Sequence, residues 1–399
     1  MGKDVEEAML RIVLRKGEDK RARAGHPWVF SNEIGEIAGN REPGAAAEIY
    51  DAGGSFIGIG YHNPRSLIAA RIMARSRADI DTPDFYRERI AAALARRRHF
   101  YPGLTTFRAV YGEGDFLPGL VVDKYGDYLS VQFLTCGMEQ RRELISGVLL
   151  ELFAPLGIVA RNDAPVRALE GLEEKVEVLH GAPPELVEIE EHSLRFRVDL
   201  LHGQKTGHFL DQKDNHLLLK ERVKEKEVLD CFCYSGSWGI HAAAFGAAGV
   251  TCVDISEKAA ALVRENAALN GFAGTVACEA VDAFERLRTL KSDGRSFDVV
   301  VLDPPAFVKS KKMLREAMKG YFTINRRAME LLRPGGFLIT CSCSYHMERE
   351  MFRELLANAA QKAGRQMQLV EVRSQAPDHP VLLAVPETEY LKCFVLQAL

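Results

Sequence analysis

Three segments of the chain carry side chains that could do covalent chemistry. Cys343 lies in the run Leu338-Ile-Thr-Cys-Ser-Cys-Ser344, downstream of Asp303-Pro304-Pro305. A thiolate is a nucleophile, and covalent catalysis splits one difficult step into two. A glycine loop, Cys233-Tyr-Ser-Gly-Ser-Trp-Gly239, bends the backbone so that a ligand can approach it closely. Together the three segments suggest an enzyme that methylates a base.

The residues around the glycine loop predict alternating strands and helices. Val228-Leu-Asp-Cys-Phe-Cys is typical of a short buried parallel strand, and residues 240–245 are predicted to be a helix. A second apolar strand, residues 250–253, ends in Asp254 and leads into an Ala-rich helix through Asn270. An acid at the tip of the second strand of such a βαβ unit suits a ribose with two hydroxyls.

Two more predicted strands end in acids. Residues 276–281 lead to Asp282-Ala283, and residues 297–302 lead to Asp303. One such acid alone is more often a helix N-cap or a solvated turn, but four aligned strand ends favour a ligand site at the carboxyl edge of a doubly wound sheet. Because the loop lacks a complete G-x-G-x-x-G, S-adenosylmethionine fits better than a dinucleotide.

Several motifs carry a resemblance to a known family. Residues 230–236, Asp303-Pro-Pro-Ala-Phe307 and Gly203-Gln-Lys-Thr-Gly-His-Phe-Leu-Asp-Gln212 look like those of the bacterial large-subunit ribosomal RNA cytosine-C5 methyltransferases that carry a PUA domain. Gly25-His-Pro-Trp-Val-Phe-Ser-Asn-Glu-Ile34 resembles the PUA module, and residues 112–120 resemble the linking domain. The resemblance spans nearly the whole chain.

The resemblance implies methyl transfer from S-adenosylmethionine to C5 of a cytosine. C5 is a poor nucleophile, so a thiolate must first add to C6. In the family the nucleophile lies in Ser-Cys-Ser, here Ser342-Cys343-Ser344, so the role falls to Cys343 rather than Cys341. Cys343 is also nearer the carboxyl end of the predicted strand. The resemblance further implies that Asp303 hydrogen-bonds the cytosine ring and stabilises the charge that accumulates during addition.

The other cysteines have a structural interpretation. A free cysteine in a parallel sheet is usually a small buried hydrophobic side chain, and this is the expectation for Cys231, Cys252, Cys278 and Cys341. Two Cys-x-Cys pairs could instead form a metal site, but zinc ligands are usually spaced by two to four residues and these pairs lie in predicted strands. We therefore expect reduced thiols and no metal.

The expected cofactor residues come from the glycine loop, the strand tips and the segment 203–215, which in the family forms a hairpin and turn over the cofactor. They are Thr206, Phe209, Asp211, Gln212, Tyr234, Ser235, Gly236, Asp254, Asp282, Ala283 and Asp303. A hairpin without a binding role is the alternative for residues 203–215, and His202 and His208 are expected to be structural. Ala306 replaces a cysteine that assists product release in another branch of RNA methyltransferases, so the base that removes the C5 proton is not assigned.

Cations next to aromatic residues near the N-terminus suggest contact with single-stranded RNA. Phe307 and Tyr321 could also contact the RNA by stacking on a flipped cytosine. The candidates for RNA contact are therefore Arg11, Arg15, Lys16, Lys20, Arg21, Arg23, Trp28, Phe307 and Tyr321. A cation run is usually a solvated face, and the net charge of −3 argues against indiscriminate coating of nucleic acid. The expected partner is large-subunit ribosomal RNA.

The composition and periodicity predict three domains. The 399 residues are 47% hydrophobic and 27% charged, with no apolar run near membrane-helix length and no signal peptide, so a soluble cytoplasmic protein without a membrane partner is expected. We predict a PUA-like RNA-binding β-barrel (1–77), an α+β linking domain (78–184) that opens with an amphipathic helix from Thr82 to Phe100, and a Rossmann-like α/β methyltransferase domain (185–399).

Two other functions remain open from the sequence. Asp-Pro-Pro followed by an aromatic residue also serves enzymes that methylate a nitrogen of guanine or adenine, which need no nucleophile. An RNA-binding assembly factor without turnover is the second alternative, although intact motifs argue against it. The sequence leaves open the modified nucleotide, the choice between free RNA and an assembling subunit, and the oligomeric state, for which a homodimer is one option.

Overall fold

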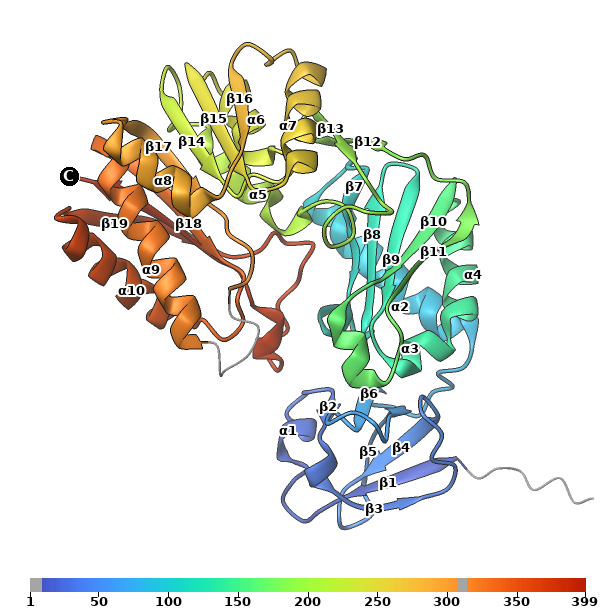
Figure 1. The fold of residues 1–399 in the computed structure, drawn as a ribbon. Helices are drawn as coiled ribbons and strands as arrows, with labels where there is room; N and C mark the ends of the chain where they lie inside the picture. Colours follow the sequence, from blue (N-terminus) through green and yellow to red (C-terminus); the bar gives the residue numbers. More distant parts are fainter. Residues whose placement is uncertain (1–8, 308–313) are drawn as a thin grey trace, which may run out of the picture. The chain divides into compact units, whose positions relative to one another are not determined.

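The computed structural model describes residues 9–307 and 314–399, which form two compact units (Figure 1). The first unit comprises residues up to 189, 198–208 and 377–388, and the second comprises 190–197, 209–376 and 389–399. The sequence assigned 377–388 to the catalytic domain. In the structure these residues pack within the first unit, where the main-chain oxygen of Asp378 accepts a hydrogen bond from buried Arg97 at 2.7 Å.

A six-stranded sheet in the order β2-β6-β5-β4-β1-β3 occupies the N-terminal part of the first unit. Its strands and its one short helix are β1 (Leu10–Leu14), α1 (Lys20–Arg23), β2 (Trp28–Val29), β3 (Ile34–Ala38), β4 (Ala46–Tyr50), β5 (Phe56–His62) and β6 (Ala70–Ala74). A tight turn joins β4 to β5, because Asp51 Oδ1 accepts the backbone N–H groups of Gly53 and Ser55. The sequence-based prediction of this hairpin is confirmed.

A five-stranded sheet in the order β11-β10-β9-β8-β7 follows. Its elements are α2 (Pro83–Phe100), β7 (Thr106–Tyr111), β8 (Leu120–Tyr125), β9 (Tyr128–Phe133), α3 (Cys136–Gln140), α4 (Arg142–Phe153), β10 (Gly157–Asn162) and β11 (Lys175–Gly181). The amphipathic helix has almost its predicted bounds. Thr82 takes the N-cap position and Pro83 the first helical position, where its missing N–H costs nothing.

The second unit is built on a seven-stranded sheet in the order β16-β15-β14-β17-β18-β20-β19. The strands are β14 (Glu227–Cys231), β15 (Gly249–Asp254), β16 (Val276–Ala280), β17 (Phe297–Leu302), β18 (Leu332–Ser342), β19 (Met367–Arg373) and β20 (Lys392–Ala398). The first five are parallel and β20 is antiparallel to both of its neighbours. A separate two-stranded sheet pairs β12 (Val187–Glu191) with β13 (Leu194–Val198).

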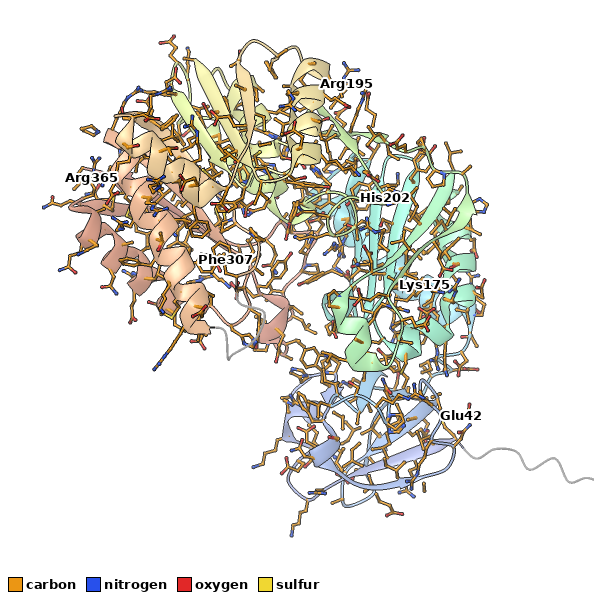
Figure 2. All side chains as sticks on the ribbon, viewed as in Figure 1. Glu42, Lys175, Arg195, His202, Phe307 and Arg365 are labelled. Carbon is orange, nitrogen blue, oxygen red and sulfur yellow. The ribbon has the colours of Figure 1, made fainter. Side chains whose placement is uncertain are left out.

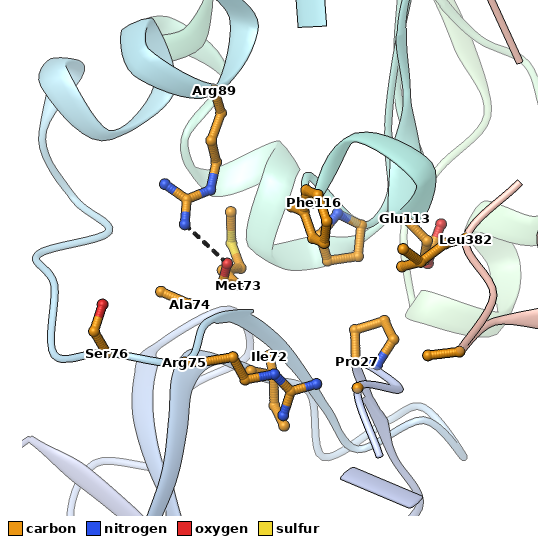
Figure 3. A pocket seen from close by; sticks show the side chains of 13 residues that line it. Pro27, Ile72, Met73, Ala74, Arg75, Ser76, Arg89, Glu113, Phe116 and Leu382 are labelled. Carbon is orange, nitrogen blue, oxygen red and sulfur yellow. Dashed lines mark hydrogen bonds between the residues drawn. The ribbon is translucent and has the colours of Figure 1, made fainter. Parts of the chain in front are cut away.

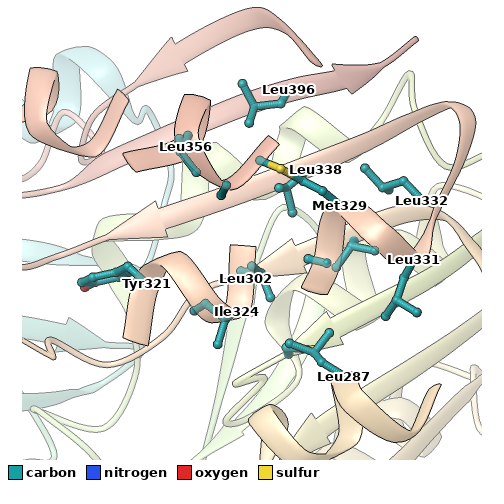
Figure 4. Packing of buried hydrophobic residues seen from close by; sticks show 14 of the residues in the cluster. Leu287, Leu302, Tyr321, Ile324, Met329, Leu331, Leu332, Leu338, Leu356 and Leu396 are labelled. Atoms are coloured by element: carbon teal, nitrogen blue, oxygen red, sulfur yellow. The ribbon is translucent and has the colours of Figure 1, made fainter. Parts of the chain in front are cut away.

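Helices cover both faces of the seven-stranded sheet, as a doubly wound fold requires. They are α5 (Lys213–His216), α6 (Ser237–Ala244), α7 (Glu257–Leu269), α8 (Ala283–Ser292), α9 (Leu314–Leu331) and α10 (Arg349–Ala363). Alternate residues of β17 point to opposite faces. Val299 and Val301 pack with α6 and α7, whereas Val300 and Leu302 pack with α8, α9 and α10 (Figure 4). The predicted α/β fold is confirmed.

The strand order places a topological switch point beside β14. The chain continues from β14 to β15 and β16 on one side and then returns to β17 on the other side. Ligands of open α/β sheets bind at the carboxyl ends of the strands that flank such a point. Those ends carry the glycine loop after β14 and Asp303 after β17. Among the described residues, no helix is long and apolar enough to cross a membrane.

Candidate functional site

The glycine loop is held against the tip of β15. Phe232, Tyr234 and Gly236 have φ angles of 65°, 48° and 83°, in the left-handed region. This turns successive N–H groups toward β15, so that Tyr234 N donates to Asp254 Oδ2 at 3.0 Å. Helix α6 begins at Ser237, within the segment 233–239 and three residues earlier than the sequence predicted. Tyr234, Ser235, Gly236 and Asp254 are thus brought together.

The acids at the other strand tips have different surroundings. Asp254 Oδ1 accepts the N–H of Ser256 at 2.9 Å, and two oxygens leave the carboxylate further acceptor capacity. Asp282 is exposed, and its Oδ1 accepts the N–H of Glu285 at 2.9 Å, so it is the N-cap of α8. Asp282 therefore has the helix-capping role that the sequence offered as the alternative to ligand binding. Neighbouring Ala283 is buried.

Asp303 is fixed by two side chains from distant parts of the second unit. Gln212 Nε2 donates to its Oδ1 at 2.9 Å, and Trp238 Nε1 donates to its Oδ2 at 3.1 Å. Both oxygens thus accept from N–H donors. Sequence reasoning assigned Gln212 to the cofactor and gave Trp238 no role. Spacing carries no signal for either contact, because Gln212 and Trp238 lie 91 and 65 residues before Asp303 in the sequence.

The strand that precedes the glycine loop carries a buried acid. Asp230 in β14 is fully buried, and its Oδ2 accepts the N–H of Gly239 at 3.0 Å. Burial, with the charge of Asp303 as the next cause, raises the pKa of Asp230 to about 7. Acidic side chains at this edge suit S-adenosylmethionine, because its sulfonium is a cation and it brings no phosphate. The residues of this edge fit that cofactor.

Cys343 lies one residue beyond the end of β18 and is half-buried. Its Sγ lies 4.0 Å from the main-chain oxygen of Pro304, so the structure brings the Ser-Cys-Ser segment to the Asp-Pro-Pro segment. Cys341 is fully buried, and burial raises the pKa of its thiol. All eight cysteines are free, and Cys343 is the one beside Pro304.

Tyr321 corrects an expectation from the sequence. The ring was expected to stack on a flipped cytosine, but it is fully buried. Its Oη lies 3.2 Å from Ser342 Oγ and 3.1 Å from Ser344 Oγ, and its ring packs on Phe307 with centroids 4.7 Å apart. Tyr321 therefore supports the segment that carries Cys343. Phe307, labelled in Figure 2, is half-buried and also packs on Phe232 and Phe284.

The segment 203–215 forms turns, the short 3₁₀ helix Leu210–Gln212 and the first residues of α5, not the expected hairpin. Thr206 belongs to the first unit, where it is fully buried and its hydroxyl donates to Asp123 at 2.5 Å. Phe209 and Asp211 belong to the second unit. The Phe209 ring packs on Tyr234 at 5.3 Å, and Tyr390 donates to Asp211 at 2.6 Å. Thr206 is thus a structural anchor in the first unit, against its predicted cofactor role.

Lys392 is a functional candidate that sequence reasoning did not single out. It pairs with Ser342 across β18 and β20, and its buried Nζ donates to the main-chain oxygens of Ser344 and Tyr390, both at 2.7 Å. Burial lowers the pKa of Lys392 to about 8, although attraction to Cys343 works against this shift. A buried ammonium next to the Cys343 segment favours a thiolate there.

Two of the six N-terminal cations form ion pairs with nearby acids. Arg21 forms an ion pair with Glu33 at 3.0 Å, and Arg23 forms ion pairs with Asp19 and Asp51. The other members of the predicted cluster are exposed, namely Arg11, Arg15, Lys16 and Lys20. The indole N–H of Trp28 is already paired, because it donates to Glu113 Oε1 at 2.8 Å.

A cavity of about 650 Å³ opens within the first unit and was not predicted (Figure 3). Pro27 and Ile72 form part of its apolar wall, and the ring of Phe116 is 52% exposed beside it. Arg75 and Arg89 add two guanidinium groups, the second of which donates to the main-chain oxygen of Met73 at 3.0 Å. An apolar wall with cations suits an unstacked nucleotide. Its lining comes from five separate segments, so no local pattern could have shown it.

Known families match both parts of the chain. Residues 170–393 match the family described as S-adenosylmethionine-dependent methyltransferase, and residues 12–75 match a PUA-like domain. Among solved structures, an S-adenosylmethionine-dependent methyltransferase from Streptococcus mutans has a TM-score of 0.83 at 20% identity, covering 98% of this chain and all of the other. A methyltransferase in complex with SAH has a TM-score of 0.85, with the same identity and coverage. At that identity the likeness shows the fold.

Curated relatives are similar over nearly their entire length. A Vibrio cholerae protein named ribosomal RNA large subunit methyltransferase I is 42% identical over 395 residues, which cover 97% of this chain and 99% of the relative. The protein of the same name from Aeromonas salmonicida is 41% identical over 391 residues, with the same coverage. The chain therefore belongs to the S-adenosylmethionine-dependent methyltransferases, in the family of the proteins named ribosomal RNA large subunit methyltransferase I.

Proposed function

We propose that this enzyme methylates C5 of a cytosine in large-subunit ribosomal RNA and that Cys343 is its nucleophile. The observation that carries the proposal is the half-buried Cys343 thiol, 4.0 Å from the main chain of the Asp-Pro-Pro segment at the ligand-binding edge of the sheet. The names of the curated relatives supply the RNA class.

The proposed reaction passes through a covalent adduct between Cys343 and the cytosine. The Cys343 thiolate adds to C6 of the flipped cytosine, an S–C6 bond forms, and the π electrons of the C5=C6 double bond move toward C5. S-adenosylmethionine, when bound, would supply the methyl group to C5 and leave as S-adenosylhomocysteine. A base then removes the C5 proton, the S–C6 bond breaks and the thiolate is restored. Lys392 keeps a positive charge near the sulfur before addition and after release.

Asp303 is proposed to orient the base. Since both of its oxygens accept from N–H donors, the carboxylate is presented as an acceptor, and the exocyclic amine of cytosine is a matching donor. The same property favours the second candidate function, methylation of an amine nitrogen on guanine or adenine, because that amine would also donate to Asp303. The requirement for Cys343 separates the two.

RNA contact is proposed for the first unit. The exposed cations Arg11, Arg15, Lys16 and Lys20 would contact phosphates, and the cavity beside Phe116 would accept a base. Phosphate contacts make affinity fall with salt. The contribution of Trp28 would be indirect, through its bond to Glu113.

The proposal is tested by identifying the modified nucleoside. Purified enzyme is incubated with methyl-labelled S-adenosylmethionine and unmodified large-subunit RNA, and the RNA is digested to nucleosides. Label in 5-methylcytidine supports the proposal. Label in a methylated guanosine or adenosine would replace it by the nitrogen-methylation function, and absence of label with every RNA tested would favour an assembly factor.

Asp254→Ala should weaken S-adenosylmethionine binding by about 10- to 100-fold, because a ribose hydroxyl loses a charged acceptor. Isothermal titration calorimetry measures the change. Glu257→Ala is the matched control, since Glu257 is an exposed acid three residues further on that pairs with Arg264. Equal affinity in native protein and Asp254→Ala would remove Asp254 from the cofactor site.

Lys392→Met should slow alkylation of Cys343 by iodoacetamide at pH 7 about tenfold, because the ammonium that favours the thiolate is lost. In the native protein Lys392 is charged below its pKa of about 8, so the difference between the two proteins should shrink as the pH rises above 8. Alkylation is followed by mass spectrometry of the Cys343 peptide. Lys392→Arg should restore much of the rate, and exposed Lys362→Met should leave it unchanged. Identical pH profiles for native protein and Lys392→Met would contradict this role.

A further inference from the structure

Three buried side chains of metal-ligating types meet in the second unit, and none of them is among the residues assigned above. Glu191 ends β12, His216 ends α5 and His241 lies in α6, and their side chains are buried, with relative exposures of 4%, 1% and 0%. One potential ligand atom from each lies within 4.8 Å of the other two. Because long stretches of sequence separate the three residues, no spacing motif indicates the cluster, and the sequence led us to expect no metal.

The orientation of His241 points its free lone pair into the cluster. Its Nδ1 lies 2.8 Å from the main-chain oxygen of Ser237, an acceptor, so Nδ1 carries the proton. Its Nε2 has no hydrogen-bond partner among the described residues, although the ring is fully buried. That nitrogen lies 3.7 Å from Glu191 Oε1, too far for a hydrogen bond. Burial of an acceptor without a partner is unfavourable, so a ligand at this nitrogen would stabilise the ring.

The other two side chains already share a proton. His216 Nδ1 lies 2.6 Å from Glu191 Oε1, which is a short hydrogen bond. Two imidazoles and one carboxylate thus converge. The Nδ1–H of His241 donates to the main-chain oxygen of Ser237, which lies outside the cluster. Metal-binding histidines usually make this kind of outer bond, which fixes the tautomer and aims the second nitrogen.

We propose that Glu191, His216 and His241 form a binding site for one divalent transition-metal ion, best suited to Zn²⁺. Nitrogen and carboxylate ligands bind Zn²⁺ at about 2.0–2.2 Å, and small shifts of these three side chains would bring them to such distances. The ion replaces the proton shared by Glu191 and His216, and it gives His241 Nε2 its missing partner. The Glu191 carboxylate offsets part of its charge, and a water molecule takes the fourth position.

The site would position the catalytic edge without touching the substrate. The His216 ring packs edge-on against Trp238 with centroids 4.7 Å apart, and Trp238 donates to Asp303. His241 and Trp238 share helix α6. An ion at the cluster would therefore join β12, α5 and α6 and hold the indole that fixes Asp303. This consequence holds whichever base is methylated.

The test measures metal binding by the full-length, tag-free protein after chelator treatment. Co²⁺ is the probe, because its visible absorption reports the coordination, and Zn²⁺ is the competitor. We expect one equivalent of Co²⁺, displaced by Zn²⁺, and a Zn²⁺-dependent rise in the thermal unfolding temperature. His241→Ala should abolish both effects, and Glu191→Gln, which keeps the shape of the side chain, should weaken binding about tenfold or more. His180→Ala removes an exposed histidine of the first unit and should change nothing.

Two results would overturn the site. The first is native protein that takes up no Co²⁺ and unfolds at the same temperature with and without Zn²⁺. The second is Co²⁺ binding that persists in Glu191→Gln and His241→Ala, which would assign the ion elsewhere, to the cysteines if sulfur-to-metal charge-transfer bands accompany it. If His241→Ala does not fold, Glu191→Gln alone decides between these outcomes.

Discussion

Cys343→Ala should reduce the formation of 5-methylcytidine by about a thousandfold or more, because removal of a nucleophile abolishes the covalent route. S-adenosylmethionine affinity should stay within a factor of two, since the predicted cofactor residues lie on other strand tips. Methyl transfer under single-turnover conditions and calorimetry of cofactor binding measure the two effects separately.

Cys341→Ala is the matched control for this variant. Cys341 lies in β18, two residues before Cys343, but it is fully buried against α6 and α7. Its replacement should cost some stability through a small cavity and leave methyl transfer close to native. A Cys343→Ala enzyme that retains native methyl transfer would contradict the covalent mechanism and favour methylation of a nitrogen.

Asp303→Asn should lower kcat by about 100- to 1000-fold, because the amide places a donor where the carboxylate presents an acceptor. The substitution keeps the size of the side chain, so the effect should fall on the chemical step more than on stability. The new NH₂ group would also face an N–H donor from Gln212 or Trp238. Single-turnover rates and thermal unfolding of the variant measure the two contributions.

Two variants help to interpret Asp303→Asn. Asp293→Asn removes an exposed carboxylate of the same unit and should be neutral. Trp238→Phe deletes one hydrogen bond to Asp303 while the aromatic packing stays, and it should produce a smaller loss of kcat, about tenfold. Native activity in Asp303→Asn would show that the carboxylate does not orient the base.

The sequence predicted the catalytic sheet well, because local patterns determine its strands. Residues 297–302 form an apolar run that ends in an acid, and β17 has these bounds. Likewise, Asp254 was placed at a strand tip because the strand before it is short and buried. The same logic brought the glycine loop and Asp303 to one edge, as parallel strands share a direction.

Local sequence patterns could not predict the contacts between distant segments. The bond from Trp238 to Asp303 and the approach of Lys392 to the Cys343 segment depend on how helices and an antiparallel strand pack on the finished sheet. The Glu191, His216 and His241 cluster has the same origin. Tyr321 shows the converse error, since an aromatic residue near a motif was assigned to the substrate although its helix turns it into the core.

The covalent adduct itself is the most direct test of the proposed mechanism. RNA transcribed with 5-fluorocytidine in place of cytidine is incubated with enzyme and S-adenosylmethionine. Because fluorine at C5 cannot leave as a proton does, the methylated adduct should persist. Mass spectrometry of the digested complex should find the modified nucleotide on the peptide that contains Cys343, and Cys343→Ala should form no adduct. A denaturation-resistant complex attached at another residue, or none at all with an enzyme that still methylates ordinary RNA, would contradict the account.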